Sequence, residues 1–243
     1  MSRLKNQVAV ITGASSGIGA AIAKVFAKEG AHAVLAARSH DKLQSVVAEI
    51  QANGGQATAV ICDVTDEGAV QSLFDEVVSR FSRLDILVNN AGLAKGGPIE
   101  ELDFQTWRDV MSVNLDGAFL CSREAFKSMK PQHRGRIINI GSVSAKMPRA
   151  NSAPYATSKF ALEGLTRSLA LDGRDFGISV GVLQPGNTMT SIWEGREEAV
   201  SAEGVMNADD LAQVALAMAS LPDGVSVLES TVLPISMPFL GRG

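Results

Sequence analysis

A hydroxyl, a phenol and an amine lie close together in the sequence between residues 142 and 159. Tyr155, the only tyrosine of the chain, and Lys159 are four residues apart in a segment with apolar residues at helical spacing, so we expect both on one helix face. The pKa of a free tyrosine is about 10, and a cation one turn away lowers it toward the range where a general acid or base works well. Ser142 follows a short apolar run and could hold a substrate oxygen beside the phenol. These residues predict a site of proton transfer.

The same pair also has a purely structural interpretation. In many helices a tyrosine is half-buried and a lysine one turn away is only solvated. A short motif stays a hypothesis until its structural context agrees with it. The rest of the chain supplies that context.

Short β-branched runs alternate along the chain with longer amphipathic segments. Strands are predicted at residues 8–11, 33–36, 59–61, 86–88, 137–140, 178–183 and 225–228. Helices are predicted near residues 17–29, 41–52, 66–81, 103–129, 153–172 and 208–220, with Asn207 capping the last one and residues 222–224 turning the chain into the last strand. This alternation is typical of a parallel sheet covered on both faces. We expect one α/β domain over residues 1–243, with a variable loop at about 187–206 that forms either a substrate lid or a surface excursion.

The composition limits the classes of function. The chain of 243 residues is long enough for one large domain, and its net charge of −4, without any Lys/Arg run, disfavours binding to nucleic acid or an anionic membrane. No apolar run approaches the length of a signal-peptide core or a membrane span. Cys62 and Cys121 cannot form a disulfide framework and suit a reducing compartment. His32, His40 and His133 lack metal-ligand spacing, so we expect them at the surface of a soluble, cytoplasmic protein.

A glycine-rich turn joins the first predicted strand to the first helix, in Thr12-Gly13-Ala14-Ser15-Ser16-Gly17-Ile18-Gly19. Glycines at such a junction allow a tight turn and a close approach of the backbone to a phosphate, whose charge then lies at a helix N-terminus. A glycine-rich turn can also simply relieve crowding. Its place between strand and helix favours phosphate binding.

Together these motifs resemble the short-chain dehydrogenase/reductase family, in the family's order and over nearly the whole chain. Residues 12–19 match its T-G-x-x-x-G-x-G, Asp63-Val64 its adenine-contacting pair, Asn89-Asn90-Ala91-Gly92 its N-N-A-G, and residues 185–190 its P-G-x-x-x-T. Each motif has a structural alternative: Asn89-Asn90 could tie strands together, Asp63 could cap a helix, and Asn114 could bond a kinked backbone. The resemblance implies a doubly wound Rossmann domain with seven parallel strands, whose cofactor lies across their carboxyl ends.

The resemblance also implies the site and its reaction, the interconversion of a carbonyl and a secondary alcohol on a small molecule without a metal ion. The implied catalytic residues are Asn114, Ser142, Tyr155 and Lys159. The implied cofactor-binding residues are Gly13, Ser15, Ser16, Gly17, Ile18, Gly19, Arg38, Ser39, Asp63, Val64, Asn90, Ala91, Gly92, Tyr155, Lys159, Pro185, Gly186, Thr188 and Thr190. Tyr155 would transfer the proton and Ser142 would polarise the carbonyl oxygen. Lys159 would bind the nicotinamide ribose and, through water held by Asn114, connect the site to solvent.

NADP(H) is the expected cofactor. In this fold an acidic side chain at the end of the second strand accepts hydrogen bonds from the ribose 2′-hydroxyl of NAD and repels a 2′-phosphate. This chain has Ala37 at that point and Arg38 next, so the repulsion is absent and a guanidinium is present. Ser16 stands where many NADP-dependent relatives carry a second cation, so the expected preference is incomplete.

The substrate and the assembly are less constrained by the sequence. The chain lacks the T-G-x-x-x-x-x-D-G-G ending of acyl-carrier-protein reductases, which favours hydroxy-acid, sugar or xenobiotic carbonyl substrates over a 3-oxoacyl-(acyl-carrier-protein) substrate. Lys95, Lys146, Arg149 and Arg196 would rim the site, as a carboxylate-binding group or as solvated charges. The helices near 103–129 and 153–172 and an apolar tail at 237–240 favour a homodimer or homotetramer. A catalytically silent nucleotide sensor or structural subunit stays the alternative from another class.

Overall fold

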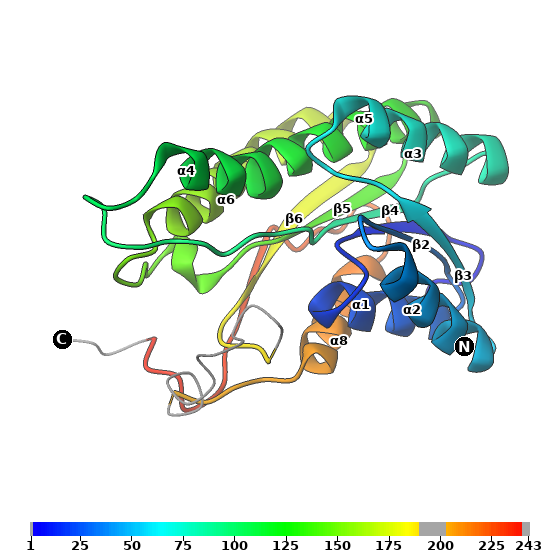
Figure 1. The fold of residues 1–243 in the computed structure, drawn as a ribbon. Coiled ribbons are helices and arrows are strands. Elements are labelled where there is room, and N and C mark those ends of the chain that lie inside the picture. The colour runs from blue at the N-terminus through cyan, green and yellow to red at the C-terminus, as the bar shows by residue number, and fades with distance from the viewer. Residues whose placement is uncertain (1, 190–202, 240–243) are drawn as a thin grey trace.

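A computed structural model of the chain describes residues 2–189 and 203–239. In these residues seven strands form one parallel sheet in the order β3-β2-β1-β4-β5-β6-β7 (Figure 1). The strands are β1 (Val8–Thr12), β2 (His32–Ala37), β3 (Gln56–Ile61), β4 (Ile86–Asn89), β5 (Gly135–Ile140), β6 (Ile178–Pro185) and β7 (Glu229–Val232). The strand order reverses between β1 and β4, which confirms the predicted doubly wound α/β fold.

Helices cover both faces of the sheet (Figure 1). They are α1 (Gly17–Lys28), α2 (His40–Ala52), α3 (Glu67–Phe81), α4 (Phe104–Met111), α5 (Gly117–Gln132), α6 (Ala153–Gly173) and α8 (Ala208–Ala219). Helices α1, α2 and α8 lie on one face, and α3, α4, α5 and α6 on the other. Along β1, Ala9 and Ile11 belong to the core under α1, whereas Val8 and Val10 belong to the core under α3 and α5. Burial on both faces explains why the strand is apolar at its first four positions, residues 8–11.

The helix predicted at residues 103–129 is interrupted. A π-helical turn, Ser112–Asp116, separates α4 from α5. Asn114 lies in this turn with 1% of its surface exposed, and its side-chain oxygen accepts a hydrogen bond from the backbone N–H of Leu93 at 2.7 Å. π turns insert one residue into a helix and are frequent at functional sites. The apolar period of the sequence does not reveal a single inserted residue, so the prediction of one continuous helix was wrong here.

The last strand begins later than predicted. The turn at 222–224 is confirmed, since the N–H of Val225 donates to the carbonyl of Pro222 at 3.1 Å, but residues 225–228 do not form the strand. Instead, the Val225 carbonyl accepts a hydrogen bond from the Arg136 guanidinium at 3.1 Å, and 47% of the surface of Val225 is exposed. Residue pairing with β6 begins at Glu229, opposite Val182, and the preceding Leu228 carbonyl accepts a hydrogen bond from the Val182 N–H at 3.0 Å. The Arg136 guanidinium, which comes from β5 on the far side of β6, thus binds a backbone carbonyl that the predicted strand 225–228 would have placed in the sheet.

Two smaller expectations have mixed outcomes. Asn207 caps α8 as predicted and forms a reciprocal capping box with Asp210. His40 and His133 are exposed as expected. His32 is half-buried, because it begins β2 and its Nε2 lies 2.8 Å from the Thr58 hydroxyl of the adjacent β3. Within residues 2–189 and 203–239 there is no helix long and apolar enough to cross a membrane. Those same residues contain no cluster of three His, Cys, Asp or Glu side chains that could hold a metal ion.

A chain of buried polar side chains links the centre of the sheet to two helices. Asn89 on β4 and Asn139 on β5 are register partners, and the Asn89 amide donates to the Asn139 oxygen at 2.8 Å. The same Asn89 amide donates to the Ser122 hydroxyl of α5 at 3.0 Å, and the Asn139 amide donates to the Thr166 hydroxyl of α6 at 2.8 Å. Asn89 thus ties two strands together, as its structural alternative proposed. Buried polar networks of this kind fix one arrangement of the elements that they join.

Candidate active site

A cavity of about 1390 Å³ opens at the carboxyl ends of the strands. Its walls come from the segments that follow β1 to β6, which is where open α/β sheets bind their ligands. Every predicted site residue in the described part of the chain lines this cavity except Gly19 and Asn114. Thr190 lies outside the described residues.

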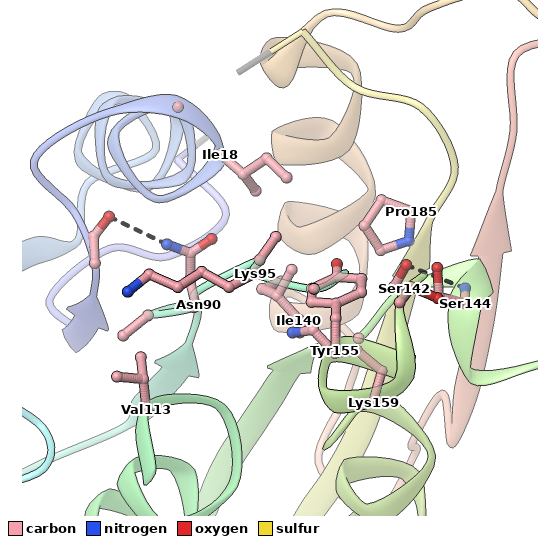
Figure 2. A pocket seen from close by; sticks show the side chains of 18 of the residues that line it. Ile18, Asn90, Lys95, Val113, Ile140, Ser142, Ser144, Tyr155, Lys159 and Pro185 are labelled. Carbon is pink, nitrogen blue, oxygen red and sulfur yellow. Dashed lines mark hydrogen bonds between the residues drawn. The ribbon is translucent and has the colours of Figure 1, made fainter. Parts of the chain in front are cut away.

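Helix α6 carries the predicted proton donor and its lysine. Pro154 occupies the first turn of the helix, a position where proline is tolerated because its missing N–H has no helical partner. Tyr155 and Lys159 follow on one face, with Lys159 Nζ 5.7 Å from the centre of the Tyr155 ring. Figure 2 shows both side chains on the wall of the cavity, with Ser142 next to Tyr155. The geometry confirms the helical spacing inferred from the sequence.

Lys159 is buried and holds α6 against the end of β5. Only 5% of its surface is exposed, and its Nζ donates a hydrogen bond to the carbonyl of Ile140 at 2.8 Å. Burial disfavours the ammonium ion and lowers the pKa of Lys159 to about 8. The amine can therefore change its protonation state close to neutral pH.

The pKa of Tyr155 moves in the direction opposite to the prediction. Burial of the phenol raises its pKa, and the hydrogen bond with the Ser142 hydroxyl opposes this increase only in part. The expectation that Lys159 lowers it was wrong for this structure, because the Lys159 ammonium is turned to the Ile140 carbonyl and desolvation of the phenolate dominates. Tyr155 is accordingly protonated at neutral pH, the state that a proton donor needs.

Ser142 is fixed from two sides at the end of β5. Its hydroxyl accepts a hydrogen bond from the backbone N–H of Ser144 at 3.1 Å and lies at the phenol of Tyr155 (Figure 2). Its backbone N–H donates to the side-chain oxygen of Gln184 at 3.0 Å. Gln184 is fully buried on β6 and was missed by the sequence analysis. The available signal was an amide side chain directly after the apolar run 178–183.

Asn114 lies behind the cavity wall. Its amide donates to the Leu93 carbonyl at 3.0 Å and to the Ser158 hydroxyl at 2.9 Å, so it bonds the kinked backbone as its structural alternative proposed. Gly92 stands beside it: a Cβ added at Gly92 would lie 3.6 Å from the Asn114 side-chain oxygen and 4.0 Å from Lys159 Nζ. Gly92 thus lies next to both Asn114 and Lys159, while the water link between these two side chains stays a prediction.

The glycine turn after β1 is packed directly against residues 90–91. A Cβ at Gly13 would lie 2.8 Å from the Ala91 Cα, and a Cβ at Gly19 would lie 2.4 Å from the Asn90 amide nitrogen. Gly13 also has a positive φ of 62°. Gly19 is therefore a packing residue below the turn and does not line the cavity, while its contact with the cofactor stays a prediction.

The same turn leaves the first turn of α1 open to the cavity. Ser16 precedes α1 and makes no side-chain cap, and the first helical residues Gly17 and Ile18 line the cavity. The backbone N–H groups at a helix N-terminus have no helical partner and bind phosphates well. The residues present therefore fit a dinucleotide cofactor.

Two cations line the far end of the cavity, beyond β2. The Arg38 side chain is 77% exposed, and its guanidinium is 3.9 Å from the Asp63 carboxylate. Partial burial raises the pKa of Asp63, but hydrogen bonds from Thr65 and the charge of Arg38 outweigh it, so the pKa is lowered and the carboxylate stays charged. Lys42, in the first turn of α2, also lines the cavity and was missed by the sequence analysis. Its spacing of four residues from Arg38 was the available signal.

The four basic residues that were predicted to rim the site lie in different places. Lys95 lines the cavity, 3.7 Å from the Asp109 carboxylate. Lys146 does not line it and is 2.5 Å from the Glu229 carboxylate. Arg149 lines the cavity, where it pairs with Glu203 and donates to the buried Asn187 side chain at 3.2 Å. Arg196 lies outside the described residues.

Comparison with known proteins agrees with this geometry. The family model described as short chain dehydrogenase matches residues 7–201. A 3beta-hydroxysteroid dehydrogenase of Mediterraneibacter gnavus is 37% identical over 80% of this chain and 70% of its own length. A 3-oxoacyl-(acyl-carrier-protein) reductase of Synechocystis sp. is 39% identical over 80% of this chain and 79% of its own length. The crystal structure of a metagenomic short-chain oxidoreductase in complex with NADP is 37% identical, has a TM-score of 0.85, and covers 96% of this chain and 99% of its own.

Proposed function

The chain belongs to the short-chain dehydrogenase/reductase family, and from that premise we propose that it interconverts a carbonyl and a secondary alcohol on a small molecule with NADP(H). The observation that carries the proposal is the contact of the Tyr155 phenol with the Ser142 hydroxyl on the wall of a cavity that fits a dinucleotide. Substrate oxygen placed there would meet a proton donor and a hydrogen-bond donor together.

Each catalytic residue has a separate role in the proposed reaction. NADPH, when bound, supplies a hydride to the carbonyl carbon of the substrate. Tyr155 donates its phenolic proton to the carbonyl oxygen, and its raised pKa keeps that proton in place until the oxygen gains charge. The Ser142 hydroxyl donates a hydrogen bond to the same oxygen and stabilises the developing charge. Lys159 would hold the cofactor ribose and return a proton to Tyr155 that comes from solvent through the water link at Asn114. In the oxidation of an alcohol, each transfer runs in reverse.

The remaining cofactor contacts belong to the proposal as well. They are Gly13, Ser15, Ser16, Gly17 and Ile18 around the phosphates; Arg38, Ser39, Asp63 and Val64 at the adenosine end; and Asn90, Ala91, Gly92, Pro185, Gly186 and Thr188 toward the nicotinamide, all on the cavity wall. Thr190 lies outside the described residues. Gly19 and Asn114 do not line the cavity; the proposed role of Asn114 is to hold the water that connects Lys159 to solvent.

One other substrate class has specific support, and one alternative from another class stays to be tested. A relative that is 39% identical is named a 3-oxoacyl-(acyl-carrier-protein) reductase, so an acyl chain on a carrier protein is the second candidate substrate. Against this candidate, the chain lacks the T-G-x-x-x-x-x-D-G-G ending of the family's acyl-carrier reductases. In this part of the chain it has β7, where the Glu229 carboxylate pairs with Lys146. A catalytically silent nucleotide sensor would keep the cavity without needing Tyr155, which makes that residue the discriminating one.

Replacing Tyr155 by Phe removes the proton donor and leaves the cavity wall intact. We expect kcat to fall by a factor on the order of 10²–10⁴ for every carbonyl that the parent reduces, while the Kd for NADPH changes by less than about threefold. The measurement is cofactor absorbance over a panel of ketones, hydroxy acids, sugars and acyl-carrier thioesters. Thr157, exposed on the same turn of α6, gives the matched control Thr157→Val, which should leave kcat unchanged. A Tyr155→Phe enzyme with parental kcat would refute the proton donor, and a parent that binds NADPH but turns over none of the panel would favour the sensor.

The preference for NADP(H) is assigned to Arg38, with Lys42 as a second cation. We expect the parent to use NADP(H) with a kcat/KM about 10- to 100-fold above that for NAD(H), as a charge-assisted contact of roughly 1.5–3 kcal/mol would give. The double variant Ala37→Asp/Arg38→Ala should reverse the preference, and Lys42→Ala should weaken it without reversing it. Arg80→Ala, an exposed arginine at the end of α3 away from the cavity, should have no effect. A parent that already prefers NAD(H) would contradict the assignment.

A homodimer or homotetramer is proposed from the surface of α5 and α6. Phe119 on α5 is 46% exposed and Phe160 on α6 is 49% exposed, and these helices lie on the same face of the sheet (Figure 1). The C-terminal tail supports assembly less than expected, because Met237 packs back against Gly186 and Leu240 lies outside the described residues. Light scattering at micromolar concentration should therefore give a mass of two or four chains. A species of 25.5 kDa alone would contradict this proposal.

The cellular location belongs to the proposals too. Cys62 and Cys121 are free thiols, and both are buried. Free buried thiols are typical of proteins from a reducing compartment, which favours the cytoplasm.

A further inference from the structure

Gln184 is the side chain that fixes the backbone at Ser142. It is fully buried near the end of β6, and its Oε1 accepts the Ser142 N–H at 3.0 Å. The Gln184 side chain packs tightly against the residue before Ser142: a Cβ added at Gly141 would lie 2.6 Å from the Gln184 Oε1. Gln184 does not line the cavity, so its side chain does not contact substrate or cofactor itself.

Glu163 in turn fixes the orientation of the Gln184 amide. A backbone N–H can only donate, so Gln184 must turn its oxygen to Ser142 and its nitrogen the other way. That nitrogen donates to a Glu163 carboxylate oxygen at 3.1 Å. Burial raises the pKa of Glu163, but the nearby cations Arg167 and Lys146 and the Gln184 hydrogen bond outweigh this and lower it, so the carboxylate is an acceptor at neutral pH. If the Gln184 amide were flipped, its oxygen would face the Glu163 carboxylate, which has no hydrogen to donate, so Glu163 excludes that orientation.

The outer end of this chain lies at the surface, between α6 and β7. Glu163 pairs with Arg167 at 2.6 Å and is 3.7 Å from Lys146, and both cations also contact Glu229 of β7. Glu163 lies one helical turn after Lys159 on α6. Helix α6 is therefore joined to the end of β5 twice, once through Lys159 and once through Glu163 and Gln184.

We propose that Gln184 and Glu163 are positioning residues for Ser142: Glu163 sets the Gln184 amide, and Gln184 holds the Ser142 backbone so that its hydroxyl meets the phenol of Tyr155 and the substrate oxygen. The inference rests on the proposed function of Ser142. It requires that loss of Gln184 acts on the chemical step, and that it acts through Ser142 alone. A small displacement of a group that touches the reacting atoms is enough to cost a large part of the rate.

The first test separates positioning from general damage. Gln184→Met keeps the length of the side chain and loses both hydrogen bonds; we expect kcat to fall about 10- to 100-fold while the Kd for NADPH changes by less than about twofold. Glu163→Met should lower kcat less, and Glu163→Gln, which keeps an acceptor oxygen, should restore it to within about threefold of the parent. The matched control is Gln132→Met, which removes the two hydrogen bonds that another glutamine amide makes with Leu84, one with its N–H at 3.1 Å and one with its carbonyl at 2.8 Å. Gln132 does not line the cavity, so this variant should lower the melting temperature without changing kcat. If Gln184→Met does not fold, the two Glu163 variants carry the test.

The decisive measurement is a double-mutant cycle with Ser142→Ala. In the Ser142→Ala background, the further replacement Gln184→Met should lower kcat by less than about threefold, because the group that it positions is already gone. A strong loss in Ser142→Ala combined with a silent or fully additive Gln184→Met would overturn this inference and leave the proposed function standing. A fully active Ser142→Ala would overturn the role of Ser142 itself, and this inference with it.

Discussion

The hydrogen bond from the Lys159 ammonium to the Ile140 carbonyl is the contact on which the site depends. It joins the helix that carries Tyr155 to the last residue of the strand that leads to Ser142, and it does so at 2.8 Å in a nearly water-free position. Because the phenol and the hydroxyl come from different elements, their contact requires α6 and β5 to be held at a fixed offset. The cost of this arrangement is a buried cation, whose pKa falls to about 8.

The rest of the fold supports that offset with neutral and charged hydrogen bonds. The Asn139–Thr166 bond ties α6 to the residue before the end of β5. The path through Glu163 and Gln184 ties α6 to Ser142, just after β5, by way of β6. On the other side of the reversal in strand order, the glycine turn after β1 packs against residues 90–91 and opens the N-terminus of α1 to the cavity. The sheet thus holds the proposed cofactor contacts and the proposed proton donor in one rigid frame.

Local patterns of the sequence predicted the positions of helices and strands. They did not predict contacts between residues that meet only when two strands lie side by side. Helical spacing placed Tyr155 and Lys159 on one face, and apolar runs located six of the seven strands, because both depend on residues close in the chain. Gln184 could not be assigned to Ser142, because their contact exists only when β6 lies beside β5. The direction of the Tyr155 pKa shift was mispredicted for the same reason: burial is a property of the packed fold, and here it outweighs a cation on the same helix. The contact of Arg136 with the Val225 carbonyl likewise joins residues far apart in the sequence.

The most direct test of this account is the titration of Lys159 itself. In protein labelled with ¹³C at the lysine Cε, the signal that disappears in Lys159→Met can be followed through pH by NMR. Its chemical shift should report a midpoint at about 8, the value that burial against the Ile140 carbonyl gives. A midpoint near 10.5, the value of an unperturbed lysine, would mean that the ammonium is solvated and that α6 is not anchored to β5 in this way.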